Sequence, residues 1–314
     1  MAAEYDIIII GGGPGGLSAA SSIVRQDHKT LLLDSGKYRN MKSKMHTLAS
    51  WDHRDPEEFR AAARADFDRY GSVTVDYAEV DTVKQQEEHF EVSANDKTWT
   101  AKKIILATGV EDVFPDIQGY ADCWITGIFH CLYCHGWEER GISTAGMLAE
   151  GDTGAVVPAL HVARQALRMA DRVTLYTNGN KKLADELEAA LEVAPAPMVV
   201  NGQKITKLVK APKRSQVTVE LEDGTSITEG FIAHKPKTKL RGDLAQQLGL
   251  EITPMNTIKV LPPFNQTSVK GVFAAGDCSS PMMTLTQALA TGTCVGGGAP
   301  LQIQAEMYHQ KAIF

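Results

Sequence analysis

A mostly apolar run, Tyr5–Ile10, leads directly into a glycine-rich turn near the start of the chain. A continuous apolar run is typical of a parallel strand that is covered on both faces. Gly11 would permit the tight turn, Gly13 would let backbone amides approach a pyrophosphate, and Gly16 would let helix and strand pack closely. With Pro14 inside it, the turn predicts a dinucleotide-binding site.

The residues after the turn complete a strand–helix–strand unit. Leu17–Arg25 is small and apolar enough to form a helix, and Lys29–Leu33 returns as a second strand. The N-terminus of such a helix presents free N–H groups and the positive end of its dipole to phosphates. Asp34 ends the second strand, about 20 residues after the turn, where a carboxylate would accept hydrogen bonds from an adenosine ribose.

Two later segments indicate that the dinucleotide is FAD. An Ala-Thr-Gly sequence that contains Thr108 and Gly109 ends a buried strand, as at the point where two-dinucleotide flavoproteins return the chain beneath the cofactor. A second strand, Thr267–Ala275, rises into Gly276 and Asp277. The Asp277 carboxylate is placed to bind the ribityl chain, so we expect both ends of the sequence to contribute to one flavin site.

Length and composition are those of a globular protein with two domains. The 314 residues exceed one compact core, and the net charge of −6 argues against a nucleic-acid partner. No apolar run approaches the roughly 20 residues that span a bilayer. The first apolar run lacks a preceding basic segment, so we expect no signal peptide and no membrane association, and we expect a cytoplasmic location.

Between the flavin segments the chain carries the sequence His130-Cys131-Leu132-Tyr133-Cys134-His135. Two intervening residues place both sulfurs on one side of a helical turn, close enough to bond. A helix N-terminus and neighbouring imidazoles lower the pKa of a thiol, which supplies thiolate near neutral pH. His135 is predicted to exchange a proton with an incoming thiol, and His130 is either a second catalytic imidazole or a solvated surface residue.

Other interpretations of the cysteine pair have less support. A Cys-x-x-Cys-His sequence also attaches c-type haem, but that chemistry needs an exported chain. Zinc could use the pair with His130 or His135, although structural zinc sites commonly use two such pairs, and the sequence has only one. A buried, inert pair is the remaining alternative. Because the flavin segments explain a redox pair directly, we predict that no metal is bound.

Taken in order, these motifs resemble the low-molecular-weight thioredoxin reductase family over nearly the whole chain. The resemblance implies an α/β fold with two Rossmann-like dinucleotide-binding domains and a homodimer. It also implies a discontinuous FAD-binding domain, residues 1–116 and 245–314, into which a central domain, residues 117–244, is inserted. The cysteine pair and a nucleotide-type strand–turn–helix unit would lie in that central domain.

The central domain departs from this family where a nicotinamide nucleotide should bind. The second glycine-rich turn is replaced by Ala149–Gly154, which contains Glu150 and Asp152. Two carboxylates would oppose the approach of a pyrophosphate. After the next strand, Thr177–Asn180 offers no arginine for a 2′-phosphate. We therefore predict a degenerate NADPH site.

His135 is a second departure, because thioredoxin reductases usually carry aspartate there. The segment from Cys131 to Glu138 resembles the fungal dithiol oxidases of gliotoxin type. That resemblance implies an enzyme that closes a disulfide in a small-molecule dithiol of the epipolythiodioxopiperazine class and passes the electrons to O2, giving H2O2. It also implies that Cys131 is the outer, attacked sulfur and Cys134 the flavin-proximal one. The alternatives are an NADPH-dependent thioredoxin or disulfide reductase, and a flavin-binding protein without turnover.

Overall fold

The computed structural model describes residues 3–39 and 43–314, and the chain divides into two compact units. The first unit is discontinuous and comprises Met1–Glu111 and Thr238–Phe314, whereas the second comprises Asp112–Lys237. Both divisions fall a few residues before the boundaries expected from the sequence. The segments that join the units pair with each other as strands β7 (Val110–Val113) and β16 (Lys237–Leu240).

The first unit is built on a seven-stranded sheet with the order β3-β2-β1-β6-β5-β4, in which β17 also pairs with β6. Its strands are β1 (Tyr5–Ile10), β2 (Thr30–Leu33), β3 (Val73–Asp76), β4 (Thr82–Gln85), β5 (Phe90–Ala94), β6 (Lys97–Leu106) and β17 (Val272–Ala274). Strands β1, β2, β3 and β17 run parallel within the sheet, and β4 and β5 extend it as an antiparallel pair. The predicted first strand is confirmed residue for residue.

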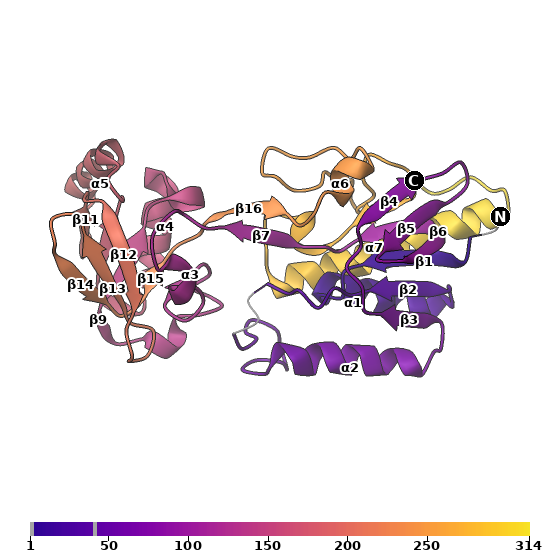
Figure 1. The fold of residues 1–314 in the computed structure, drawn as a ribbon, viewed down its shortest axis with the longest axis horizontal. Coiled ribbons are helices and arrows are strands. Elements are labelled where there is room, and N and C mark those ends of the chain that lie inside the picture. The colour runs from indigo at the N-terminus through magenta and orange to yellow at the C-terminus, as the bar shows by residue number, and fades with distance from the viewer. Residues whose placement is uncertain (1–2, 40–42) are drawn as a thin grey trace. The chain divides into compact units, whose positions relative to one another are not determined.

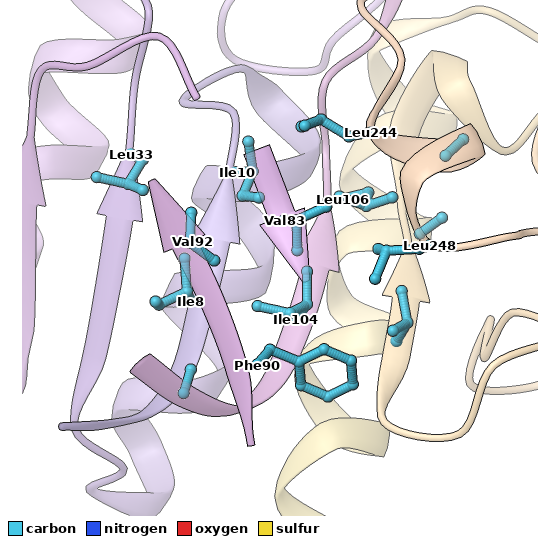
Figure 2. Packing of buried hydrophobic residues seen from close by; sticks show 14 of the residues in the cluster. Ile8, Ile10, Leu33, Val83, Phe90, Val92, Ile104, Leu106, Leu244 and Leu248 are labelled. Carbon is cyan, nitrogen blue, oxygen red and sulfur yellow. The ribbon is translucent and has the colours of Figure 1, made fainter. Parts of the chain in front are cut away.

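Side chains of β1 alternate between two hydrophobic cores, one on each face of this sheet. Ile8 and Ile10 belong to one core, which Figure 2 shows together with Leu244 and Leu248 from the C-terminal part of the chain. Ile7 and Ile9 belong to the other core. Burial on both faces explains why the strand is apolar at consecutive positions rather than at alternate ones.

Helices cover both faces of this sheet (Figure 1). They are α1 (Pro14–Ile23), η1 (Val24–Gln26), α2 (Pro56–Asp68), α6 (Leu244–Gln247), η4 (Gly276–Cys278) and α7 (Leu285–Met307). Helices α1 and α7 pack together on the face that carries Ile7 and Ile9. Of the described helices, including the 23-residue α7, none is both long and apolar enough to cross a membrane.

Close contact between α1 and α7 depends on glycine. A Cβ atom at Gly292 would lie 2.3 Å from the carbonyl oxygen of Gly15, and one at Gly296 would lie 2.6 Å from the Cβ of Ser22. The Ser18 hydroxyl donates a hydrogen bond to the Leu289 carbonyl across the same interface. These contacts join the first and last helices of the unit, which are more than 250 residues apart in the sequence.

The second unit contains a five-stranded parallel sheet with the order β11-β10-β9-β15-β8 and a three-stranded antiparallel sheet with the order β12-β13-β14. The strands are β8 (Ile128–Phe129), β9 (Ile142–Leu148), β10 (Ala170–Tyr176), β11 (Met198–Asn201), β12 (Ile205–Lys210), β13 (Val217–Leu221), β14 (Ser226–Glu229) and β15 (Ile232–Ala233). The helices are α3 (Tyr120–Cys123), η2 (Trp137–Glu139), η3 (Gly151–Thr153), α4 (Val156–Ala166) and α5 (Lys181–Val193). The sheets and helices of the two units give the α/β architecture that the sequence predicts.

We predict that Gly292→Ala destabilises the protein, whereas Gly297→Ala on the same helix does not. A methyl group at Gly292 meets backbone atoms that cannot move aside, while a methyl group at Gly297 would have only one side-chain atom, of Phe264, within 4 Å. Overpacking costs about 1–3 kcal/mol, and alanine in place of glycine stabilises an open helical position by about 1 kcal/mol. Urea unfolding of both variants would test this, and equal midpoints would contradict the packing argument.

Candidate active site

The predicted dinucleotide turn brings the first strand of the first unit against the end of β6. Gly11 has a φ of +119°, and a Cβ atom there would lie 2.2 Å from the carbonyl oxygen of Ala107. A Cβ atom at Gly16 would lie 1.9 Å from the carbonyl oxygen of Gly11. Both positions therefore require glycine for backbone packing, as the sequence predicts.

Gly13 faces open space in a way that suits a ligand. A Cβ atom at Gly13 would meet nothing within 4 Å, although Gly13 is the N-cap of α1. No side chain caps this helix, and Pro14 occupies its first turn. An uncapped N-terminus directs N–H groups and positive dipole at whatever lies in front of it, which suits a pyrophosphate.

Asp34 lies directly after β2 and is only 1% exposed. Its Oδ1 accepts a hydrogen bond from the Gly36 N–H at 2.9 Å, and its Oδ2 accepts one from the Tyr38 hydroxyl. Burial and the bond to Asp34 raise the pKa of Tyr38, so this hydroxyl remains a donor. A carboxylate has about four lone-pair sites, so Asp34 retains capacity for ribose hydroxyls.

The second flavin segment converges on the first glycine turn. The Ala275 N–H donates to the Leu106 carbonyl at 2.9 Å, and a Cβ atom at Gly15 would lie 3.3 Å from the Gly276 nitrogen. Gly276 has a φ of +78°, and its N–H donates to the Thr291 hydroxyl. The structure thus assembles residues from both ends of the chain around one turn.

The remaining flavin candidates lie beside this junction. Gly109 has a φ of +68°. The buried Cys278 thiol lies near the backbone of Thr108 and Gly109 and donates to the carbonyl oxygens of Leu106 and Ala275, at 3.4 and 3.2 Å. Burial raises the pKa of Cys278 to about 11, so that residue is a thiol and not a nucleophile at neutral pH. Oδ2 of Asp277 lies 3.4 Å from Nη1 of Arg39, so the predicted ribityl ligand also carries an ion pair.

In the second unit, Cys131 and Cys134 form a disulfide with their Cα atoms 5.2 Å apart. The N–H groups of Cys134 and His135 both donate to the Cys131 carbonyl, at 3.1 and 3.0 Å. These residues form a turn between β8 and η2, so the prediction that the pair lies at a helix N-terminus is wrong. Instead, the Cys134 N–H lies 3.1 Å from the Cys131 sulfur, where it favours negative charge on that atom.

Both predicted histidines lie in this turn, and each stacks on an aromatic ring. His130 stacks on Trp124 with ring centroids 5.5 Å apart, and His135 stacks on Phe129 at 5.2 Å. The two imidazole centroids are 6.2 Å apart. The structure therefore brings together all four predicted residues of the redox site and fixes the planes of the two imidazole rings.

The turn after β9, where the sequence predicts a degenerate nucleotide site, is held by several contacts within its own unit. The Glu150 carboxylate accepts a hydrogen bond from the Asn178 amide at 3.0 Å, which links this turn to the turn after β10. The Asp152 N–H donates to the Lys235 carbonyl, and the two side chains form an ion pair at 3.5 Å. A Cβ atom at Gly151 would lie 3.1 Å from that same carbonyl oxygen.

A separate group of metal-ligating side chains lies in the loop before α2, and it does not involve the cysteines. His46, Asp52 and His53 place one ligand atom each within 4.8 Å of one another. The Asp52 carboxylate contacts His46 at 3.0 Å and His53 at 3.4 Å, and its side chain is 57% exposed. These contacts account for the cluster as an exposed carboxylate between two imidazoles, and we assign no metal to it.

Comparison with known proteins agrees with this arrangement of two nucleotide-type units and a redox pair. The family model described as pyridine nucleotide-disulphide oxidoreductase matches residues 5–292. The chain belongs to this family. It is therefore an oxidoreductase and an FAD-binding flavoprotein, as the sequence predicts.

Fungal proteins described as thioredoxin reductases are similar over nearly their whole length. The chain is 45% identical to thioredoxin reductase tcpT of Claviceps purpurea, over 98% of this chain and 97% of that protein. It is 39% identical to thioredoxin reductase sirT of Leptosphaeria maculans, over 95% and 94%. These matches confirm the predicted likeness to thioredoxin reductases.

Solved structures confirm the fold. The oxidoreductase from Agrobacterium tumefaciens superposes with a TM-score of 0.84 at 30% identity, over 97% of this chain and 99% of that chain. The crystal structure of HlmI superposes with a TM-score of 0.85 at 27% identity, over 97% and 94%. Similarity over both units supports the two-domain Rossmann-like prediction.

Several supporting residues carry no signal in the sequence. Trp124 and Phe129 belong to no motif, and only the folded unit shows that they orient the imidazoles. Tyr38 and Arg39, which contact the two predicted flavin carboxylates, lie in a segment marked only by its position after β2. The Glu150–Asn178 bond joins two turns that are well separated along the chain.

We predict that Gly13→Val folds but loses FAD. The open space at Gly13 accepts a side chain without a clash in the protein, yet that side chain fills the place where a pyrophosphate would approach the helix. The measurement is the ratio of flavin absorbance to protein absorbance after purification, with far-UV circular dichroism as the control for folding. Full flavin content in this variant would show that the pyrophosphate binds elsewhere.

We also predict that His234 makes folding stability depend on pH. Burial lowers the pKa of His234 to about 4, whereas an imidazole in the unfolded chain titrates near about 6.5. Between these values the unfolded chain binds more protons, so stability is fully present above this window and is lost as the pH falls through it. The loss from about pH 7 to about pH 5 is about 2 kcal/mol.

A glutamine at this position cannot titrate, so His234→Gln should remove that component from urea unfolding curves recorded at the two pH values. His161→Gln is the matched control, because His161 is exposed. Identical pH dependence in wild type and His234→Gln would contradict the assignment.

Proposed function

We propose that this protein is an FAD-dependent dithiol oxidase that closes a disulfide in a small molecule and uses O2 as the electron acceptor. One observation carries the proposal. The unit that holds the Cys131–Cys134 disulfide, with a histidine on either side of it in the sequence, also has a Glu150–Asn178 hydrogen bond at the turn where a nucleotide would be expected. A redox pair without a nicotinamide site needs its electrons from a thiol substrate.

The first unit is the proposed FAD-binding domain. The residues that would hold the cofactor are Gly11, Gly13, Pro14, Gly16, Asp34, Thr108, Gly109, Gly276 and Asp277. The glycine turn with its uncapped helix is suited to the pyrophosphate, and Asp34 retains acceptor sites for a ribose. When bound, FAD supplies a two-electron acceptor for the reduced cysteine pair and a two-electron donor for oxygen.

The chemistry that this chain's own residues perform is thiol–disulfide exchange. A substrate thiolate attacks Cys131 and forms a mixed disulfide, which the second substrate thiol resolves. The product leaves with its new disulfide, and Cys131 and Cys134 keep the two electrons. His135 takes the proton of the incoming thiol, and the Cys134 N–H stabilises charge at the Cys131 sulfur. In the complete cycle, O2 accepts two electrons and two protons and becomes H2O2.

The closed nucleotide turn supports oxygen over NADP⁺ as the other half of the cycle. To admit a pyrophosphate, the protein would have to break the Glu150–Asn178 hydrogen bond and bring phosphates beside two carboxylates, those of Glu150 and Asp152. The Glu150 carboxylate would repel the phosphates, whereas the charge of Asp152 is partly balanced by its ion pair with Lys235. In the turn Ala149–Gly154, the only glycines that could let a phosphate approach the backbone are Gly151 and Gly154.

A second candidate function is an NADPH-dependent disulfide reductase, and the names of the relatives favour it. Both fungal relatives are described as thioredoxin reductases. This function would run electrons in the opposite direction, from nucleotide to disulfide. Two further parts of our proposal, a homodimer and a cytoplasmic location, are carried over from the family resemblance, and light scattering would test the first.

We predict that the flavin of the anaerobic holoenzyme is bleached by a small-molecule dithiol and not by NADPH. Admission of air should then restore the yellow colour with one H2O2 for each disulfide formed. A panel of metabolite dithiols, with reduced thioredoxin as the protein alternative, would identify the substrate class. Rapid bleaching by NADPH would establish the reductase instead.

Two variants test the cysteine assignment in the same experiment. Cys131→Ser and Cys134→Ser should each lower the rate of dithiol oxidation by at least about 10³-fold, because neither leaves a disulfide to exchange. Cys294→Ser is the control, since Cys294 is a half-buried free cysteine outside this unit. Unchanged oxidation in both active-site variants would rule out the exchange mechanism.

A further inference from the structure

A continuous series of side-chain contacts leads from the turn at Glu150 to His130, the residue directly before Cys131. His234 is 1% exposed, and its Nε2 lies 3.2 Å from the carbonyl oxygen of Glu150. Its Nδ1 lies 2.6 Å from the hydroxyl of Tyr120. Burial raises the pKa of Tyr120, so this hydroxyl is the donor to Nδ1, and Nε2–H in turn donates to the carbonyl.

The Tyr120 ring continues the series through aromatic stacking. The Tyr120 ring stacks on Trp124 with centroids 5.8 Å apart and planes 27° apart. Trp124 stacks on His130 at 5.5 Å and 29°. A backbone bridge between Trp124 and Ile128 places the indole beside the strand that leads into His130. Each ring in this series therefore limits the orientation of the next.

From this continuous series the geometry points to Trp124 as a positioning residue for the dithiol chemistry, one that fixes the plane of the imidazole of His130, the residue directly before Cys131. Trp124 stacks on Tyr120, the Tyr120 hydroxyl bonds to His234, and His234 bonds to the Glu150 carbonyl in the turn after β9. The inference rests on the proposed function. In this inference, the turn at Glu150 also helps to hold Trp124 in place, in addition to excluding a nucleotide.

An indole suits this task because it is flat, large and stiff. Stacked aromatic pairs are worth about 0.5–1.5 kcal/mol beyond the area they bury, which is enough to favour one orientation of an imidazole. Displacement of a catalytic group by about 1 Å can lower a rate about 10²-fold. Phenylalanine keeps a stacking surface at this position, whereas leucine removes it.

The test compares Trp124→Phe and Trp124→Leu in the full-length holoenzyme, with the rate of anaerobic flavin bleaching by a dithiol as the readout. We expect Trp124→Leu to be slower by about 10- to 100-fold and Trp124→Phe to stay within about threefold of wild type. Phe114→Leu is the matched control, because it removes a ring that packs on Tyr120 and Trp124 while leaving the indole that stacks on His130. Equal losses in both Trp124 variants would overturn the inference.

A double-mutant cycle separates positioning from general destabilisation. If Trp124 acts through His130, then Trp124→Leu should slow His130→Asn by no more than about twofold. Additive losses would overturn the inference, and so would full activity in His130→Asn. Neither outcome affects the proposed function, which is tested on wild-type protein by its bleaching with dithiols and with NADPH. Should Trp124→Leu not fold, Tyr120→Phe breaks the bond to His234 and is expected to show the same non-additivity with His130→Asn.

Discussion

Close backbone contact at glycine is the constraint on which the first unit depends. Gly11 meets the Ala107 carbonyl, Gly15 meets Gly276, and Gly292 meets the Gly15 carbonyl, so three distant parts of the chain pack with no side chain between them. Within the Gly11–Gly16 turn the exception is Gly13, where the space is open. Because the surrounding backbone is fixed and this position is empty, the turn is a preformed site for a rigid, charged ligand.

The second unit contains the same kind of strand–turn–helix as the first, but its turn carries different side chains. Its strand–turn–helix is intact in β9, η3 and α4, yet the turn carries two carboxylates, one of which bonds to the Asn178 amide in the turn after β10. An amide that donates to a carboxylate is no longer available to a phosphate. In our proposal, the second unit thus retains the fold of a nucleotide-binding unit while its turn supports the cysteine pair.

Much of this arrangement can be predicted from the sequence, because it depends on local spacing. The mostly apolar strand β1 and the glycine turn that follows it form as predicted. The helix expected beside the cysteines does not form, since Cys131 accepts turn hydrogen bonds instead of helical ones that continue. Trp124 escapes prediction for a different reason: stacking on His130 is a tertiary contact that no spacing rule encodes.

The discontinuity of the first unit also has a consequence for biosynthesis. Strand β17 and helix α7 pair with β6 and α1, but the ribosome makes them only after all of Asp112–Lys237. The inserted unit can therefore complete its own sheets while the earlier unit still lacks a strand and its longest helix. During that interval the Ile104–Leu106 segment of β6 lacks its partner, and an unpaired strand edge of this kind is a site where another chain can pair.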